Sequence, residues 1–370
     1  MTRKLRVGVL FGGQSSEHDV SLRSAQAILR HIDRSRFDVV PIGITRDGRW
    51  LVGGDPLRAL AAVSRLPLEP ENADESEDSR SSMPASITDD VRAIAPTHVV
   101  GELDVVFPVL HGPNGEDGTV QGLLELAGIP YVGCGVLASA VAMDKPTAKR
   151  LFAWAGLPQA RWLLITWREW QHDSQSVEQR VEEEIGYPCF VKPANLGSSV
   201  GVTKVRAAAH LRPAIEEAGR YDRRILIEEA IDARELEVSV LGNDEPVASI
   251  VGEIIPSREF YDYEAKYIDT GSQLLIPAPI TPEQAEAARR MAVEAFRLID
   301  GAGMARVDFF LDRRTGQVLI NEVNTIPGFT AISMYPKLWE ASGLPFRELI
   351  TRLIELALER HQEKVQRRCG

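Results

Sequence analysis

The order in which strand, turn and helix patterns follow one another constrains this sequence most. An apolar run at 5–11 leads through a Gly-Gly turn into helical spacing of apolar residues at 20–32. The stretch 105–127 repeats this order around a glycine-rich loop, and a further strand is predicted at 37–44. Strands that alternate with helices form parallel sheets covered by helices. The predicted fold class is therefore α/β, with a Rossmann-like parallel sheet in the N-terminal part.

The length of 370 residues exceeds what one hydrophobic core usually organises, so several domains are expected. The segment 68–90 is acidic and rich in Ser and Pro, which predicts a surface insertion that is a solvated loop without a role of its own. Asp144 can cap a helix that has Pro146 in its first turn and ends at Gly156, so a new domain is predicted to begin there. The predicted domains are 1–142, 143–234 and 235–370.

Both later domains show further strand and helix patterns. In the central domain, strands are predicted at 189–193, 200–205 and 225–229, with helices at 176–185 and 207–218. In the C-terminal domain, strands are predicted at 235–241, 247–255, 305–311 and 318–323, with helices at 282–298 and 346–365. The last helix has an apolar face that could cover the core of its own chain or a subunit contact, and the first alternative is favoured.

Composition argues against several classes of function. The formal net charge is −11 and basic residues are scattered, so neither nucleic acid nor a membrane surface is an expected partner. Cys134, Cys189 and Cys369 are far apart and form no C-x-x-C pair, which argues against zinc, redox and disulfide motifs. The apolar run at 5–11 is too short for a secretory signal, and no stretch reaches the length of a membrane span. A cytoplasmic location is therefore expected.

The sequence ARVDFFLDRRTGQVLINEVNTIPG, at 305–328, predicts two strands joined by a turn at 313–317. Side chains two residues apart on a strand share a face, so Glu322 and Asn324 point the same way, and the turn length sets Asp308 opposite Glu322. Two carboxylates and an amide oxygen on one face, with Arg306 beside them, suit a hard cation such as Mg²⁺ or Mn²⁺.

The alternative for this hairpin is a solvated face on which Arg306 pairs internally with Asp308 or Glu322. The apolar residues that alternate with these side chains predict a well-buried sheet instead. Two carboxylates without a compensating cation would be costly there. The metal site is therefore the favoured interpretation.

The sequence FVKPANLGSSVGVTKV, at 190–205, predicts a strand that carries Lys192, a loop of small residues and a return strand. Backbone amides of such a loop can close over phosphates, to which Lys192 adds a positive charge. The order of residues is not that of a Walker A loop. Taken alone, a β-hairpin with a flexible tip explains the pattern at least as well as a phosphate-binding loop.

Two weaker signals lie at the ends of predicted strands. Glu17 and His111 both follow strands of the predicted parallel sheet, at the edge where ligands gather in such folds. Glu228 and Glu229 close an apolar strand and Glu235 follows a short break, a place that could offer backbone groups to adenine and a carboxylate to ribose. Ordinary surface glutamates are the simpler explanation of this second signal.

Six motifs in this order resemble the D-alanine–D-alanine ligases of the ATP-grasp superfamily, and together they span nearly the whole chain. They are GGQSSEHDVS (12–21), FPVLHGPNGEDGTVQG (107–122), MDK (143–145), VKPANLGSSVG (191–201), YDYEAKY (261–267) and GMARVDFF with NEVNTIPGFT (303–330). The resemblance implies a three-domain ATP-grasp architecture with ATP between the central and C-terminal domains. It also implies a homodimer and a role in making peptidoglycan precursors.

The same resemblance assigns ligand-binding residues. Two Mg²⁺ (or Mn²⁺) ions would be held by Asp308, Glu322 and Asn324, with Glu322 bridging them. The first D-alanine would face Glu17, and its carboxylate would attack the γ-phosphate of ATP to give an acyl phosphate. The nucleotide would contact Lys145, Lys192, Ser198, Ser199, Glu228, Glu229, Ile231, Glu235 and Lys266. The two D-alanines would contact Glu17, His111, Lys266, Arg306, Gly328, Ser333 and Met334.

For catalysis, the resemblance implies that Arg306 and the backbone amide of Gly328 stabilise the tetrahedral oxyanion. Ser198 and Tyr267 would form a hydrogen-bonded set with Glu17 that closes the site and excludes water. Without the resemblance, Tyr267 reads as an aromatic residue packed in a loop.

Two alternatives to a D-alanine–D-alanine ligase stay open. One is a related ATP-grasp ligase that makes D-alanyl-D-lactate or another D-alanyl product; such relatives generally lack the tyrosine found here at Tyr267, whose presence favours the dipeptide. The other is a nucleotide-binding regulator without turnover, which would be expected to lack the metal ligands or Arg306.

Overall fold

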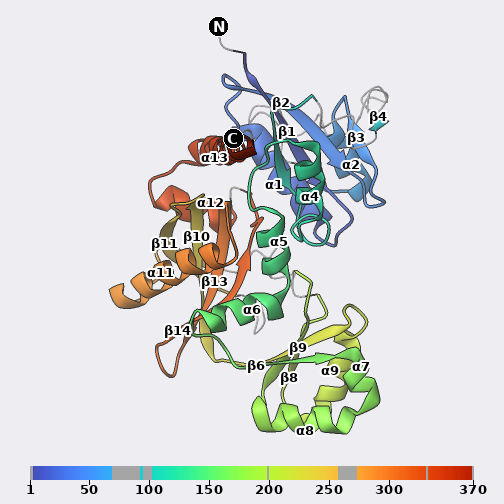
Figure 1. Cartoon of the computed structure of the whole chain (residues 1–370), viewed down its shortest axis with the longest axis vertical. Helices are drawn as coiled ribbons and strands as arrows, with labels where there is room; N and C mark the ends of the chain where they lie inside the picture. The colour runs from blue at the N-terminus through green and yellow to red at the C-terminus, as the bar shows by residue number, and fades with distance from the viewer. Residues whose placement is uncertain are drawn as a thin grey trace.

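The computed structural model describes residues 3–68, 92–94, 102–197, 200–256, 273–330 and 332–368 (Figure 1). Nearly all of the insertion predicted at 68–90 therefore lies outside the described residues. So do four residues with predicted roles, which are Ser198, Ser199, Lys266 and Tyr267. Within the described ranges, no helix is both long enough and apolar enough to cross a membrane.

The N-terminal part forms a five-stranded sheet in the order β4-β3-β2-β1-β5. Its middle is parallel, as predicted, with β1 (Leu5–Gly12) between β2 (Phe37–Ile44) and β5 (Val105–Val109). On the other side of β2, β3 (Trp50–Val52) and the edge strand β4 (Arg92–Ile94) pair antiparallel, and these two strands were not predicted. The helices of this part are α1 (His18–His31), α2 (Pro56–Ser64) and α4 (Thr119–Ala127).

The central part is a four-stranded antiparallel sheet in the order β6-β9-β7-β8. Its strands are β6 (Trp162–Thr166), β7 (Cys189–Pro193), β8 (Thr203–Val205) and β9 (Arg224–Glu229), and its helices are α7 (Trp167–His172), α8 (Ser174–Glu184) and α9 (Leu211–Ala218). The single helix predicted at 207–218 is divided into a 3-10 turn, Ala208–His210, and α9. Pro213 lacks a backbone N–H and fits in the first turn of a helix, so α9 begins just before it.

The C-terminal part contains a five-stranded sheet in the order β12-β11-β10-β13-β14. Its strands are β10 (Ala233–Gly242), β11 (Val247–Ile255), β12 (Gln273–Leu275), β13 (Gly303–Asp312) and β14 (Val318–Asn324), and its helices include α11 (Pro282–Leu298) and α12 (Met334–Ala341). From Ala305 to Leu311, buried and partly exposed residues alternate along β13. One face of the sheet therefore packs on the core, and the other carries the polar side chains.

Two helices follow the N-terminal sheet along the chain but pack against the C-terminal one. In α5 (Val136–Met143) and α6 (Lys145–Trp154), the buried residues Ala138, Ala148 and Phe152 belong to the same apolar cluster as α11 and β13. Asp144 caps α6 as predicted, because its side chain accepts a hydrogen bond of 3.0 Å from the backbone N–H of Thr147. The chain thus crosses to the C-terminal sheet before it builds the central one.

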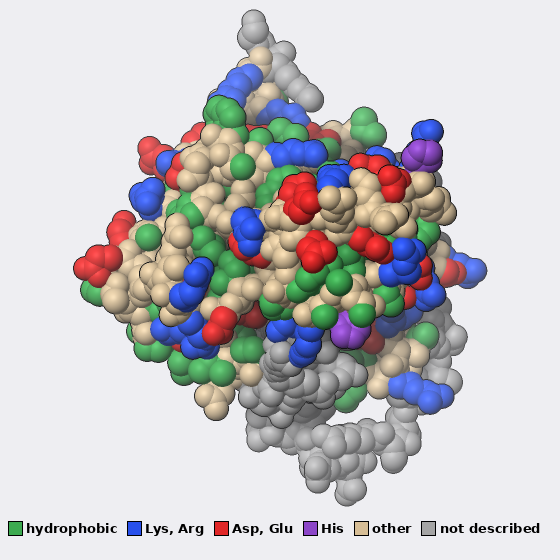
Figure 2. Space-filling view, turned by 90° about the horizontal axis from the view of Figure 1, so that it is seen from below, with side chains coloured by type: hydrophobic (Ala, Val, Ile, Leu, Met, Phe, Trp, Pro, Cys, Tyr) green, Lys and Arg blue, Asp and Glu red, His purple; other side chains and the backbone are tan. Residues whose placement is uncertain are grey.

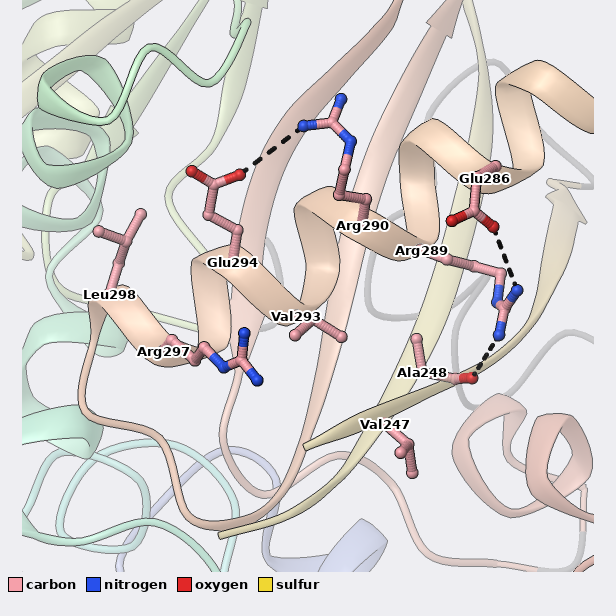
Figure 3. A pocket seen from close by; sticks show the side chains of 9 residues that line it. All are labelled: Val247, Ala248, Glu286, Arg289, Arg290, Val293, Glu294, Arg297 and Leu298. Carbon is pink, nitrogen blue, oxygen red and sulfur yellow. Dashed lines mark hydrogen bonds and ion pairs between the residues drawn. The ribbon is translucent and has the colours of Figure 1, made fainter. Parts of the chain in front are cut away.

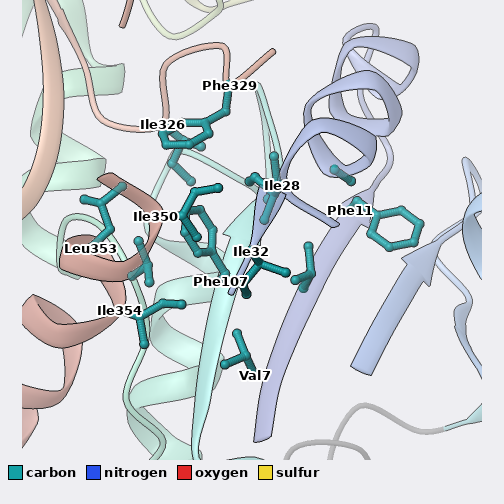
Figure 4. Packing of buried hydrophobic residues seen from close by; sticks show 14 of the residues in the cluster. Val7, Phe11, Ile28, Ile32, Phe107, Ile326, Phe329, Ile350, Leu353 and Ile354 are labelled. Carbon is teal, nitrogen blue, oxygen red and sulfur yellow. The ribbon is translucent and has the colours of Figure 1, made fainter. Parts of the chain in front are cut away.

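The last helix, α13 (Phe346–Arg368), covers the core of its own chain, as favoured above. The core that it completes is that of the N-terminal sheet. Figure 4 shows Ile350, Leu353 and Ile354 of α13 beside Phe107 of β5, with Ile326 and Phe329 in the same cluster. The loop after β14 is thereby fixed against the N-terminal sheet.

Charged side chains do not gather by sign on the face of the molecule seen from below. Figure 2 shows basic and acidic side chains interspersed there. Such a surface offers no continuous basic track to a phosphate backbone.

Candidate active site

A cleft of ≈ 1580 Å³ opens where the three sheets meet. Every residue with a predicted role that the structure describes lines this one cleft, although the residues come from all three parts of the chain. They are Glu17, His111, Lys145, Lys192, Glu228, Glu229, Ile231, Glu235, Arg306, Asp308, Glu322, Asn324, Gly328, Ser333 and Met334.

A second hollow lies on the outer side of α11 and contains none of these residues. Figure 3 shows its lining of arginine, glutamate and small apolar side chains from α11 and β11. Arg290 pairs with Glu294 at 3.9 Å, and Arg289 donates to the backbone oxygen of Ala248 at 3.3 Å. These contacts belong to the surface of a helix, so the cleft between the sheets is the candidate active site.

The acidic end of the cleft is formed by Glu237, Arg306, Asp308, Glu322 and Asn324, which lie on β10, β13 and β14. Asp308 pairs with Glu322 in the strand register, as the turn length predicted. The guanidinium of Arg306 donates two hydrogen bonds of 2.7 Å to the carboxylate of Asp308. It also lies 3.0 Å from Glu237 on the neighbouring strand.

The internal ion pair considered as the alternative for this hairpin is therefore present, and it involves the same carboxylate as the predicted cation site. Asn324 donates from its amide nitrogen to Asp308 at 2.9 Å, a bond that does not use the amide oxygen. Among the described residues, no group of three or more His, Cys, Asp or Glu side chains could hold a metal ion. The donor set is thus two carboxylates and one amide oxygen, which fits a magnesium ion that completes its shell with water and phosphate oxygens.

The cationic end of the cleft is lined by Lys145, Lys192 and Glu228, and Lys149 lies behind Glu228 without lining the cleft. Lys192 on β7 lies 2.5 Å from one carboxylate oxygen of Glu228 on β9, and Lys149 on α6 is paired with the other. Burial by itself would raise the pKa of Glu228, but Lys149 and then Lys192 outweigh it and lower that pKa to about 2. The carboxylate is therefore ionised throughout the physiological range.

Lys145 and the loop that follows β7 contact each other. The backbone N–H of Lys145 donates to the carbonyl of Ala194 at 3.1 Å, and its ammonium group donates to the carbonyl of Leu196. A Cβ atom added at Gly197 would lie 3.3 Å from the carboxylate of Glu17. The start of α1, the start of α6 and the small-residue loop therefore meet on one side of the cleft.

Glu17 is buried at the start of α1, beside the loop that follows β5. A Cβ atom at Gly112 would lie 2.9 Å from its carboxylate, and Gly112 also has a φ of +76°, so both space and backbone favour glycine there. His111 is buried as well, and its ring contacts the carbonyl of Ile326 at 2.9 Å and the hydroxyl of Ser24 at 3.3 Å. Burial lowers the pKa of His111, which favours the neutral ring.

Gly328, Ser333 and Met334 lie in and after the loop that follows β14. Ser333 precedes α12, and its hydroxyl accepts a hydrogen bond of 3.0 Å from the backbone N–H of Thr330. A Cβ atom at Gly328 would lie 3.1 Å from this hydroxyl, so the backbone of Gly328 and the side chain of Ser333 are neighbours.

Glu229 and Glu228 differ in what their side chains contact. The carboxylate of Glu229 accepts hydrogen bonds of 2.7 Å from the backbone and the guanidinium of Arg161. These bonds engage both of its oxygens, so Glu229 is left to offer the cleft its backbone groups rather than its charge.

Among the charged residues of the cleft region that sequence reasoning missed, three interact with residues of the predicted site. Lys149 and Glu237 are described above. Glu116 is the third, and its carboxylate accepts a hydrogen bond of 2.6 Å from the backbone N–H of Gly112; burial and the neighbouring Glu17 raise its pKa. Spacing could have revealed two of them, because Lys149 lies one helical turn after Lys145 and Glu237 two strand residues after Glu235.

Family models and individual relatives identify the same protein family over nearly the whole chain. The family model for the D-ala D-ala ligase N-terminus matches residues 6–134, and the model for the C-terminus matches residues 151–355. The chain is 54% identical over 362 residues to a D-alanine–D-alanine ligase of Geobacillus kaustophilus, covering 98% of this chain and 96% of the relative. A D-alanine–D-alanine ligase of Acetivibrio thermocellus is 51% identical, with 99% of each chain covered.

Solved structures give the same family. The D-alanine–D-alanine ligase of Coxiella burnetii superposes with a TM-score of 0.80 at 37% identity, covering 100% of this chain and 98% of the other. The VanG D-Ala:D-Ser ligase of Enterococcus faecalis superposes with a TM-score of 0.81 at 36% identity, covering 96% and 100%. The overall fold is thus shared by relatives named for different second substrates.

Proposed function

The chain belongs to the D-alanine–D-alanine ligase family and joins two D-alanines in an ATP-dependent reaction, and we propose how the residues of its cleft divide that work. One observation carries the proposal, namely that residues from three separate sheets, each with a role implied by the family, line a single cleft. Polar residues that are far apart in the sequence but line one cleft indicate a binding or active site.

The family requires ATP and a divalent metal. We assign two Mg²⁺ (or Mn²⁺) ions to Asp308, Glu322 and Asn324 at the acidic end. When bound, these ions neutralise charge on the phosphate groups. When Asp308 binds a metal ion, its ion pair with Arg306 must weaken or break. The guanidinium of Arg306 can then keep its ion pair with Glu237.

At the cationic end, the ammonium groups of Lys145 and Lys192 offset the negative charge of the ATP phosphates. Phosphoryl transfer depends mainly on positioning and on such charge compensation. Glu228, the backbone around Glu229 and Ile231, and the carboxylate of Glu235 form the remainder of the nucleotide site. Ser198, Ser199 and Lys266 are assigned to the same site by the family resemblance.

The first D-alanine places its ammonium group at Glu17, with His111 beside it. One oxygen of its carboxylate attacks the γ-phosphorus of ATP, and the bond to the β-phosphate breaks, which gives D-alanyl phosphate and ADP. Glu17 suits this role, since it is a buried acidic residue that lines the cleft and a carboxylate is a good hydrogen-bond acceptor for an ammonium group.

The amine of the second D-alanine then attacks the acyl carbon, which forms the C–N bond and a tetrahedral oxyanion. Collapse of this oxyanion breaks the C–O bond to phosphate, so inorganic phosphate leaves, and the nitrogen loses a proton to give the amide. We assign the stabilisation of the tetrahedral oxyanion to Arg306 and the backbone N–H of Gly328, both of which line the cleft. Ser333 and Met334, with Lys266, bind the second substrate. Ser198 and Tyr267 complete the closing set with Glu17.

The experiment that tests this function incubates the purified chain with Mg²⁺-ATP and D-alanine while ADP and D-alanyl-D-alanine are measured together. We expect one ADP per dipeptide. Parallel reactions add equimolar D-serine or D-lactate, because the D-Ala:D-Ser relative shares the fold. If D-alanine alone yields no ADP above background, the proposed activity is wrong. If a mixed product exceeds the dipeptide, the second-substrate assignment is wrong.

The role of this reaction in peptidoglycan synthesis follows from the family. The homodimer rests on the resemblance and the cytoplasmic location on composition and the apolar pattern, and both stay predictions. The small-molecule substrates of the reaction are D-alanine and ATP. The regulator without turnover is not favoured, because Arg306 and the predicted metal ligands all lie in the cleft.

A further inference from the structure

Lys149 is a buried cation that the roles assigned above do not use. It lies on α6, and its side chain is 3% exposed. Its ammonium group pairs with one carboxylate oxygen of Glu228, and Lys192 takes the other at 2.5 Å. The carboxylate of Glu228, which is 2% exposed, is therefore the ion-pair partner of two ammonium groups.

The ion pair between Lys149 and Glu228 also joins two parts of the molecule. The apolar residues of α6 belong to the core of the C-terminal sheet, whereas those of β9 belong to the core of the central sheet. A second pair connects the same two elements, since Asp144 at the start of α6 binds Arg224 at the start of β9. In Figure 1, α6 lies between β14 and the central sheet.

The three charged groups differ in how they meet the cleft. Lys192 and Glu228 line it, whereas Lys149 approaches Glu228 from α6 and is not part of the lining. Lys192 is also the more exposed lysine, at 14%. Of the two ammonium groups, only that of Lys192 is thus placed to leave the carboxylate for a ligand.

Charge counting shows what Lys149 changes. With Lys149 present, the group of three carries one net positive charge, and Glu228 stays compensated when Lys192 turns towards a phosphate. Without Lys149, the carboxylate and Lys192 would form a neutral pair. Lys192 could then reach a phosphate only by leaving a buried carboxylate without compensation, which is strongly unfavourable.

We propose that Lys149 is a positioning residue for nucleotide binding: it is the permanent counter-ion of Glu228 and so leaves the charge of Lys192 available to the phosphates. This inference rests on the assignment of the cleft as the ATP site. According to this inference, Lys149 strengthens the binding of the ligand's phosphates through Glu228 and Lys192, although Lys149 itself does not contact the phosphates.

The test compares K149M with K149R in the full chain, and with R150M as a matched control. Arg150 is the next residue of α6 and is exposed, so R150M removes a cation from the same helix without touching Glu228. For each variant, KM for ATP, KM for D-alanine and kcat are measured, together with the Kd of ADP and of adenosine.

For K149M we expect KM for ATP and the Kd of ADP to rise about tenfold or more, while the Kd of adenosine changes less than threefold. KM for D-alanine and kcat at saturating ATP should stay within about threefold of the wild type. K149R keeps the charge and should restore ADP binding, and R150M should match the wild type. Equal losses for ADP and adenosine, or ADP binding unchanged in K149M, would overturn the proposal.

If K149M does not fold, the double variant K149M/E228M replaces the buried pair by apolar side chains of similar size. In this double variant we expect the ratio of ADP affinity to adenosine affinity to equal or exceed that of the wild type, because Lys192 has lost its ion pair with Glu228 and its charge is available to the phosphates. A tenfold fall in this ratio would contradict it. A wild-type chain that consumes no ATP with D-alanine would instead refute the proposed function, so the two failures are distinguishable.

Discussion

The two ends of the cleft are built from the same kinds of side chain in opposite proportions. The cationic end has two ammonium groups, those of Lys149 and Lys192, on one carboxylate, Glu228, whereas the acidic end has two carboxylates, those of Glu237 and Asp308, on one guanidinium, Arg306. Glu228 at the first end and Arg306 at the second are each paired with two groups of opposite charge. Each end therefore retains an excess of one sign, which suits phosphates at the first and divalent cations at the second.

The two ends also differ in how the fold supports them. The acidic end lies on three adjacent strands of one sheet, so its geometry follows from strand register. The cationic end combines α6, β7 and β9 from two different cores, so its geometry depends on how the central sheet sits against the C-terminal one. A change at the acidic end should affect chemistry with little effect on folding, whereas a change at Glu228 should affect both.

The largest expected effect is that of Glu322→Gln at the acidic end. Loss of one cation ligand should lower kcat/KM by about 10²-fold to 10³-fold, because charge compensation dominates phosphoryl transfer. The thermal unfolding midpoint should stay close to that of the wild type, since the side chain faces the cleft and not the core. ADP release and circular dichroism measure the two quantities.

The matched control for this variant is Glu286→Gln on α11, which lines the outer hollow and should have wild-type activity. A wild-type rate in Glu322→Gln would remove the proposed metal site. Equal loss of activity in both variants would show that the effect is not local.

Glu228→Gln should lower the free energy of unfolding by about 3–5 kcal/mol at pH 7, because two buried ammonium groups lose their partner. The pKa of Glu228 is about 2 in the folded chain, below its ordinary value of 4.5. Its stabilising contribution is therefore complete above pH 4.5 and is lost as the pH falls towards 2. Urea unfolding of wild type and variant at several pH values should show the difference between them narrowing over that range.

Glu229→Gln is the control, since its partner Arg161 is 62% exposed and an exposed pair contributes less than about 1 kcal/mol. A difference between wild type and Glu228→Gln that does not change between pH 5 and pH 2 would contradict the account of the cationic end.

The smallest expected effect comes from Ser24→Ala, on the side of the cleft that neither charged end occupies. The hydroxyl of Ser24 accepts a hydrogen bond of 3.2 Å from the backbone N–H of Phe329 and contacts His111. Its removal should cost about 1 kcal/mol of stability and raise KM for D-alanine a few-fold, with KM for ATP unchanged. Steady-state kinetics and urea unfolding measure this, and an equal rise in both KM values would contradict the assignment of this side to the amino acid.

Much of the site could be predicted because strands have a fixed period. The facing of Asp308 and Glu322, and the common side of Glu322 and Asn324, follow from alternation along β13 and β14. The strands β2, β7 and β11 and the helix α11 were predicted to the residue, since apolar periodicity and turn residues mark both of their ends. The strands β3 and β4, each only three residues long, carry too little pattern to be recognised.

The contacts between distant segments could not be predicted. Nothing in its sequence pattern shows that α6 packs with the C-terminal sheet and pairs with β9 of the central one, or that α13 completes the N-terminal core. Such contacts depend on three-dimensional packing of apolar faces that are interchangeable in composition. For the same reason Lys149 could be seen as a helix residue but not as the partner of Glu228.

The sequence by itself determined the α/β class, the hairpin that carries the two facing carboxylates, and the family to which the motifs belong. These follow from short-range periodicity and from residue identity, which are present in the chain before it folds. The tertiary structure decided which charges meet: it paired Arg306 with Asp308 and Glu237, and Glu228 with two lysines. Charge interactions act over a few ångströms in space, and only the folded chain brings residues that are far apart in sequence to that distance.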